Sequence, residues 1–161
     1  MKDKLVYIII GIAIVIIAVF TTIMVLKNVK RNKKIENITY LRLSYTGGYA
    51  MYAYTIYTIE LIDGKYVVTV KPYGEPDENI RTTELSKEKI KELEKALTNL
   101  KVAGWNGFNE SDKYVLDGDS FSFSLKYGDN EEVSAHGYMR WPENYSNVKS
   151  YIVELINTIR D

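Results

Sequence analysis

The chain lacks cysteine altogether and holds a single histidine, His136, among its 161 residues. Without cysteine it has no disulfide, no thiolate nucleophile and no cysteine-ligated zinc site. One histidine is too few for a metal site built on several imidazoles. We therefore expect no cofactor, and the groups left for chemistry are carboxylates, hydroxyls and one imidazole.

Charge of either sign is unevenly distributed, although the formal net charge is zero. Residues 1–34 carry seven Lys and Arg against one acidic residue, whereas residues 35–161 carry fourteen against twenty. An acidic domain repels the phosphate backbone of DNA or RNA. The sequence therefore predicts no nucleic-acid partner.

Charge is absent from residues 5–26, "LVYIIIGIAIVIIAVFTTIMVL". A helix of this length spans about 33 Å, enough for a hydrocarbon core of about 30 Å. A cleaved signal peptide would have a shorter apolar region followed by a small-residue cleavage site, which the sequence lacks. We predict a short tail at 1–4, a transmembrane helix at 5–26 in contact with membrane lipid, a basic linker at 27–36 and a soluble α+β domain at 37–161.

The flanks of the apolar segment bear on its orientation in the membrane. Residues 27–34 carry five Lys and Arg, and residues 1–4 carry two lysines besides the amino terminus. The positive-inside rule, taken alone, places the domain in the cytoplasm by a small margin of charge. The side of the membrane stays open on this criterion.

The remaining chain predicts five strands and two helices in the order β-β-β-α-β-β-α. The expected strands cover residues 38–46, 49–62, 65–73, 120–127 and 132–138. Ser86 is placed to cap a helix with an apolar stripe from Ile90 to Leu100, and a second stripe runs from Tyr145 to Ile159. These elements predict an α+β fold, in which two helices cover one face of a mostly antiparallel five-stranded sheet.

Residues 120–127, "SFSFSLKY", alternate strictly between apolar and polar side chains, which is typical of a half-buried strand. On the returning strand, Val133 and Ala135 are expected to join the apolar face. His136 then points away from the core, and Ser122, Ser124 and Ser134 could lie on its side of the sheet.

The stretch "HGYMRWPENY" at 136–145 is one candidate site, because it contains the only histidine. A catalytic histidine needs a nucleophile and a group that orients its ring. The neighbouring serines do not lie in a nucleophile elbow or another activating motif. We therefore expect His136 to be a surface residue, and a hydrolase that uses it is an alternative.

The long connection at 104–120 is a second candidate, because a gap of this length is often functional in a small domain. It contains four carboxylates, Glu110, Asp112, Asp117 and Asp119. Clustered oxygens suit calcium, but their spacing differs from that of an EF-hand. Acidic turn residues are the simpler interpretation, and paired carboxylates of a hydrolase are another.

Aromatic residues near this loop and the second hairpin form a third candidate. A shared binding groove would contain Trp105, Phe108, His136, Tyr138, Arg140, Trp141 and Tyr145. The competing interpretation is that Trp105 and Phe108 fasten the loop to the core, and we favour it because large aromatic side chains are usually buried.

Three segments together resemble an uncharacterised family of bacterial cell-envelope domains: "WNGF" at 105–108, "VLDGDSF" at 115–121 and "HGYMRWPENY" at 136–145. Members of that family are carried behind a lipoprotein signal or a membrane anchor. The resemblance implies a cell-envelope setting and no activity. Together with the apolar segment at 5–26, it leads us to expect a single-pass protein of the cell membrane with its domain on the extracytoplasmic side. We expect a non-catalytic module that binds an envelope protein or ligand. The alternatives are an envelope hydrolase using His136 or the loop at 110–119, and an accessory subunit of a membrane complex.

Overall fold

The structure is a computed structural model that describes residues 2–46, 54–72, 76 and 80–158. Its elements are α1 (Lys2–Arg31), β1 (Ile38–Thr46), β2 (Tyr54–Ile62), β3 (Lys65–Pro72), β4 (Arg81–Leu85), α2 (Lys87–Asn99), the 3₁₀ helix η2 (Val102–Trp105), β5 (Phe108–Ser111), β6 (Ser120–Tyr127), β7 (Glu131–Tyr138) and α3 (Tyr145–Asn157). The strands form one seven-stranded sheet in the order β4-β3-β2-β1-β6-β7-β5. Neighbouring strands are antiparallel except β5 and β7, which run parallel.

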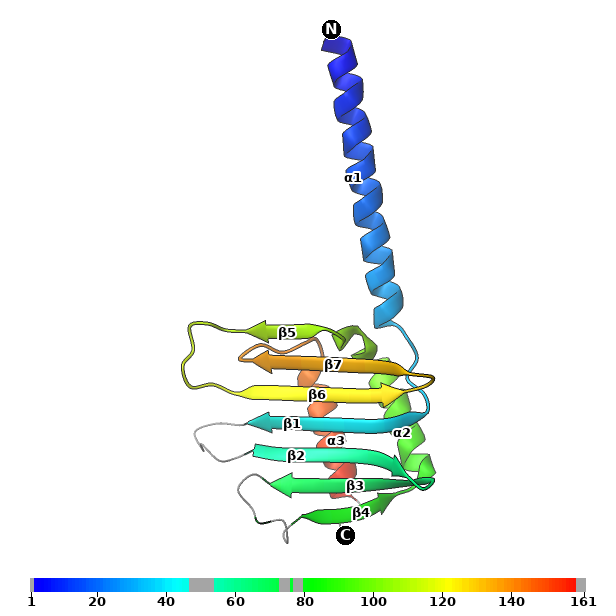
Figure 1. The fold of residues 1–161 in the computed structure, drawn as a ribbon, viewed down its shortest axis with the longest axis vertical. Helices are drawn as coiled ribbons and strands as arrows, with labels where there is room; N and C mark the ends of the chain where they lie inside the picture. The colour runs from blue at the N-terminus through cyan, green and yellow to red at the C-terminus, as the bar shows by residue number, and fades with distance from the viewer. Residues whose placement is uncertain (1, 47–53, 73–75, 77–79, 159–161) are drawn as a thin grey trace.

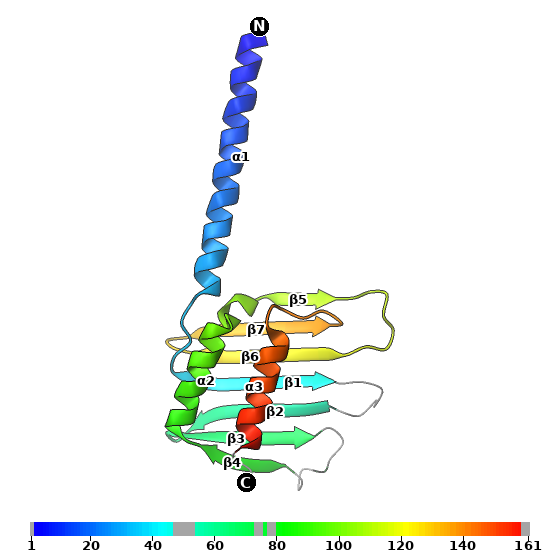
Figure 2. The same cartoon turned by 180° about the vertical axis from the view of Figure 1, so that it is seen from behind.

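The domain has two layers, the sheet and a pair of helices. Both α2 and α3 lie on the same face, behind the sheet in Figure 1 and in front of it in Figure 2. α1 stands apart from these layers and extends from the β5 end of the sheet, across the direction of the strands. The predicted α+β class is confirmed, and the helices that cover the sheet lie on one face.

The core lies between the two layers and follows the predicted periodicities. Ser86 caps α2, its hydroxyl accepting from the Lys89 N–H, and Ile90, Leu93 and Leu97 of the predicted stripe are buried. The facing side of the sheet contributes alternate residues of the strands, for which the period of two puts one side chain in two on each face. The buried hydrophobic residues of β1, β6 and β7 are Ile38, Leu41, Leu43, Phe121, Phe123, Leu125, Tyr127, Val133 and Ala135.

The hairpin turns also follow the sequence. Asp63 and Gly64 both have positive φ, 51° and 78°, as the two-residue turn between β2 and β3 requires. In the β6–β7 hairpin, Phe123 pairs with Ala135 and Ser122 with His136. The predicted register is therefore confirmed, with His136 on the side opposite the core.

The sheet has seven strands rather than the five predicted. The sequence predicts no strand between residue 73 and Ser86, where β4 lies, and none within the long connection at 104–120, which contains β5. Both are short strands at the two edges of the sheet, each bonded to one neighbour, so they carry little local periodicity. Residues 49–53 and 73 of the expected strands lie outside the described residues.

α1 extends beyond the predicted span and reaches the domain. It takes in the first five residues of the basic linker and ends at Arg31. Arg31 packs on η2, where a Cβ on Gly104 would lie 3.0 Å from Arg31 Cγ, and it forms an ion pair with Glu143. Ile35 is already part of the core, and its N–H donates to Thr98 Oγ1 at 2.9 Å. The connection between helix and domain is therefore short and held at both ends.

Candidate interaction surface

The face of the sheet opposite α2 and α3, hereafter the open face, consists of the strand residues that alternate with the core. The main rows that the register gives across the strands are four: Glu84, Val67, Glu60, Tyr40, Lys126 and Glu132; then Thr82, Thr69, Thr58, Arg42, Ser124 and Ser134; then Lys71, Ile56, Ser44, Ser122, His136 and Asn109; then Thr46, Ser120, Tyr138 and Ser111. Most of these side chains are hydroxyls. No helix covers this face in the described part of the chain.

The middle of the open face is well ordered by its own contacts. Ser44 is 2% exposed, although it lies on this face, because neighbouring strands crowd its short side chain. At the end of β1, the Thr46 hydroxyl accepts from the Ser120 N–H at 2.8 Å and lies 3.2 Å from the Ser120 hydroxyl. Arg42 is exposed between Thr58 and Ser124. The result is a hydrogen-bonding surface with one guanidinium near its centre.

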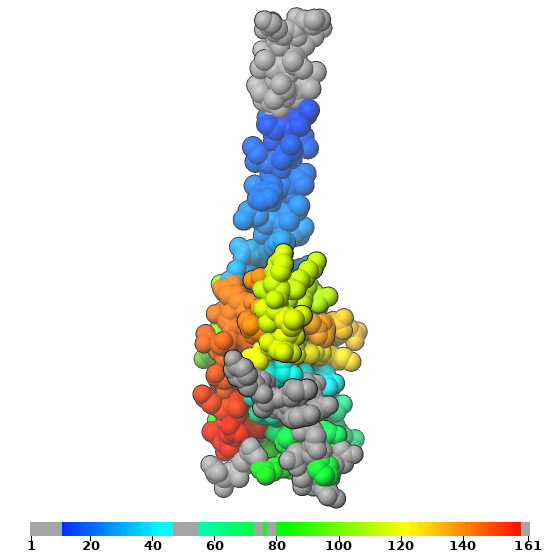
Figure 3. Space-filling model, turned by 90° about the vertical axis from the view of Figure 1, so that its left-hand side faces the viewer, coloured from blue at the N-terminus to red at the C-terminus, as the bar shows by residue number. Residues whose placement is uncertain are grey.

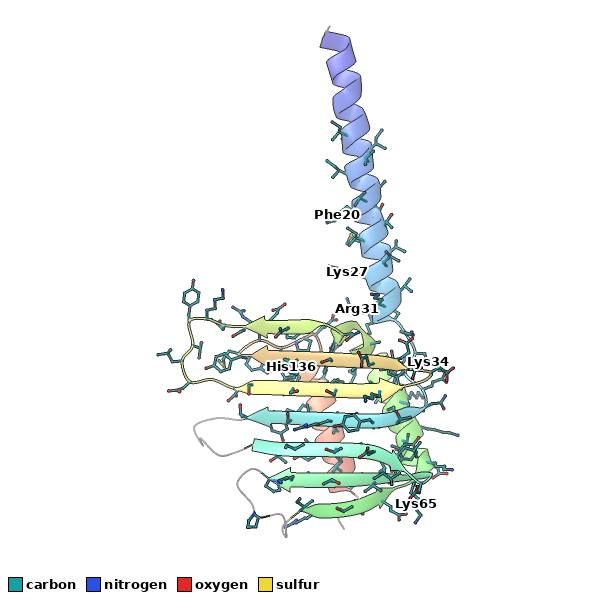
Figure 4. The ribbon with its side chains drawn as sticks, viewed as in Figure 1. Phe20, Lys27, Arg31, Lys34, Lys65 and His136 are labelled. Carbon is teal, nitrogen blue, oxygen red and sulfur yellow. The ribbon has the colours of Figure 1, made fainter. Side chains whose placement is uncertain are left out.

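His136 lies on this face, as Figure 4 shows from the open side. Its Nε2 is 3.4 Å from the Ser134 hydroxyl, and the residue opposite His136 on the neighbouring strand β6 is Ser122. A serine and a histidine at this distance could act as nucleophile and base. However, among the described residues nothing bonds to the other ring nitrogen, so the third member that orients such a pair is missing there.

The structure divides the seven predicted binding residues between two sides of the sheet. Trp105 and Tyr145 are buried in the core, and Phe108 packs against it. Burial raises the pKa of Tyr145 above its ordinary value. His136 and Tyr138 lie on the open face instead. These residues do not form one groove, and the core interpretation of Trp105 and Phe108 is the one that agrees with their burial.

The last two of the seven lie in the segment that follows β7. Arg140 forms an ion pair with Asp112 at 3.0 Å, and Trp141 is 41% exposed with its ring 6.4 Å from that of Tyr145. Trp141 is therefore half outside the core, whereas Trp105 is inside it. Arg140 serves to hold the long loop rather than to present a free charge.

The four carboxylates of the long connection are not gathered as metal ligands. Glu110 lies on β5, and Asp112 accepts from the Tyr114 N–H and from Arg140. In the described residues no group of three or more His, Asp or Glu could hold a metal ion. The weak calcium candidate thus has no geometric support.

A hollow of about 330 Å³ lies at the β6–β7 turn, away from this histidine. Its lining is mainly polar and charged, with Lys126, Glu131 and Glu132 among its residues, and does not include His136. An enzyme site usually combines apolar walls with a few convergent polar groups. The lining of this hollow contains neither His136 nor a residue of the loop at 110–119, the two alternative sites of the predicted hydrolase.

Sequence reasoning located only the β6 and β7 part of the open face. It missed Arg42, Ser44 and Thr58, which belong to β1 and β2. The alternation of β1 carries a usable signal, because Leu41 and Leu43 flank Arg42 with an inward-facing pattern. The crowded Ser44 could not be found without the register.

Comparisons with known proteins add no identification. No protein-family model matches the chain, and no curated protein matches it in sequence. The resemblance to bacterial cell-envelope domains therefore remains an expectation from three short segments.

Proposed function

We propose that this is a single-pass membrane protein whose α+β domain is a non-catalytic interaction module that binds another protein through the open face. The observation that carries the proposal is the sheet with helices on one side and a polar, hydroxyl-rich surface on the other. Flat polar surfaces suit macromolecular partners, whereas small ligands prefer concave apolar sites.

The membrane part of the proposal is supported by α1. The stretch Gly11–Arg31 is long and apolar enough to cross a bilayer, and none of it is buried inside the protein. Side chains such as Ile16 and Phe20 are more than 60% exposed. A helix that is apolar on all sides needs a nonpolar surrounding, which the domain does not give it. Lipid supplies that surrounding.

The side of the membrane is part of the same proposal. We place the domain outside the cytoplasm, on the resemblance described above and against the flank charges. Protease added to intact protoplasts should then digest the domain while a cytoplasmic control protein survives. Protection of the domain until lysis would place it in the cytoplasm.

Site-specific photocrosslinking tests the open face. A benzophenone amino acid at Ser124, which pairs with Arg42 across β1 and β6, should give one discrete protein adduct in membranes. The matched control is Lys91, an exposed residue of α2 on the opposite side of the domain, which should give none. The Arg42→Glu change should abolish the adduct at position 124, because it reverses the central charge. Equal adducts at both positions, or none at 124, would contradict the proposal.

A further inference from the structure

Outside α1, a few large hydrophobic side chains are exposed in the described part of the domain: Leu61, Ile62, Tyr114, Leu116 and Trp141. Tyr114 and Leu116 are the extreme cases, at 96% and 95% exposed. Single exposed apolar residues are normal on a soluble protein. Tyr114 and Leu116 are separated by one residue at the tip of a loop, so together they form a small exposed apolar patch.

The loop that carries them, residues 112–119 between β5 and β6, is braced from behind. The Tyr138 hydroxyl lies 2.8 Å from the carbonyl oxygen of Leu116 and 3.1 Å from that of Val115. The ion pair between Arg140 and Asp112 holds the start of the loop. Val115 is partly buried while its two neighbours are exposed. The bracing therefore fixes a conformation in which the larger side chains face outward.

This loop lies at the α1 end of the domain. β5 is the strand nearest α1 in Figure 1, and Figure 3 shows the yellow-green β5–β6 segment at the same end. Arg31 joins α1 to the domain through Gly104 and Glu143. The apolar run ends at Leu26, and five helical residues cover about 7.5 Å. The headgroup layer is about 5–7 Å thick on each side, so the β5 edge stands at its outer boundary, within reach of a long side chain.

We propose that the β5–β6 loop inserts Tyr114 and Leu116 into the interface of the bilayer that α1 spans, giving the domain a second membrane contact. The inference rests on the proposed anchoring by α1. Tyrosine side chains are enriched at the membrane–water interface. Leucine side chains of interfacial segments bury at the boundary between headgroups and acyl chains. The loop carries three aspartates, Asp112, Asp117 and Asp119, against the single exposed Lys113, and Arg140 is paired with Asp112, so the net charge is negative and anionic headgroups do not attract the loop. The contact is apolar, and zwitterionic lipid is sufficient for it.

The absence of cysteine makes a direct test simple. The full chain is placed in nanodiscs of phosphatidylcholine, with one cysteine carrying an environment-sensitive fluorophore, at Lys113→Cys in the loop. Leu26→Cys reports the span, and Ile62→Cys is the matched control on an exposed hydrophobic residue of β2. Nitroxide-labelled lipid should quench position 113 about threefold more than position 62, because only interfacial groups approach the label. Adding Tyr114→Ser and Leu116→Ser should reduce quenching at 113 to the level at 62.

The outcomes separate the contact from the anchor. The contact is supported if positions 26 and 113 are both quenched and if the double serine change removes the quenching at position 113. Quenching at 26 alone overturns the contact and leaves the anchor standing. Quenching at 113 that survives the double change overturns insertion by these two side chains. Quenching at none of the positions overturns the anchor and the contact with it.

Discussion

Trp105→Ala should be among the most destabilising single changes in the domain. The indole is 3% exposed, its ring meets that of Phe123 edge-on at 5.2 Å, and its N–H donates to the carbonyl oxygen of Glu143 at 2.9 Å. Removing a buried tryptophan costs about 3–5 kcal/mol. The unpaired carbonyl adds about 1 kcal/mol, so we expect a loss of roughly 4–6 kcal/mol in the free energy of unfolding.

Urea unfolding of residues 32–161, followed by circular dichroism, measures this loss. The fragment must begin before Ile35, because that residue is part of the core. Trp105→Phe keeps ring packing and should lose roughly half as much, which retains a folded variant for measurement. Trp141→Ala is the matched control and should cost only about 1–2 kcal/mol, because its side chain is 41% exposed. A loss below about 2 kcal/mol for Trp105→Ala, or equal losses at both positions, would refute the assignment of Trp105 to the core.

Two further predictions concern single residues. A Cβ at Gly137 would overlap the carbonyl oxygen of Arg140, so Gly137→Ala should lower the free energy of unfolding by at least about 3 kcal/mol. His136→Ala, on the exposed side of the same strand, should change it by less than about 0.5 kcal/mol. A large loss of stability at His136 would contradict the register. Burial holds the pKa of Tyr145 above its ordinary value of 10.0, so the unfolded chain releases this proton first and stability should fall as the pH rises above about 10. Tyr145→Phe should reduce that fall in alkaline urea melts and Tyr114→Phe should not; equal effects would show that Tyr145 is not the group responsible.

The elements that the sequence predicted are those whose own residues carry a period. The alternation of 120–127 and the stripe of Ile90, Leu93 and Leu97 identify a strand and a helix because each element alone has a buried and a solvated side. β5 is different, since its four residues, "FNES", form a strand only by pairing in parallel with β7. That pairing depends on a tertiary contact, and no local pattern predicts it.

The candidate site was predictable to the same extent. The outward direction of His136 follows from alternation, and the structure confirms it. The burial of Trp105 against the exposure of Trp141 does not follow from any period, because Trp105 ends the four-residue 3₁₀ helix η2 and Trp141 lies in the irregular segment after β7. Their positions depend on η2 and on the chain after β7, whose conformations are fixed by contacts such as the bond from Trp105 to Glu143.

With α1 as the proposed membrane anchor, its position would give the open face a definite orientation relative to the membrane. Since α1 extends across the strand direction, the sheet stands on its β5 edge, with β4 farthest from α1. A partner covering the open face must therefore stand beside the domain rather than above it. A partner anchored in the same membrane would already lie beside the domain. Anchoring both proteins in one membrane also raises their effective concentration. Under the proposed function, the interaction module and the accessory subunit of a membrane complex would be two descriptions of one arrangement, in which α1 would supply proximity and the open face recognition.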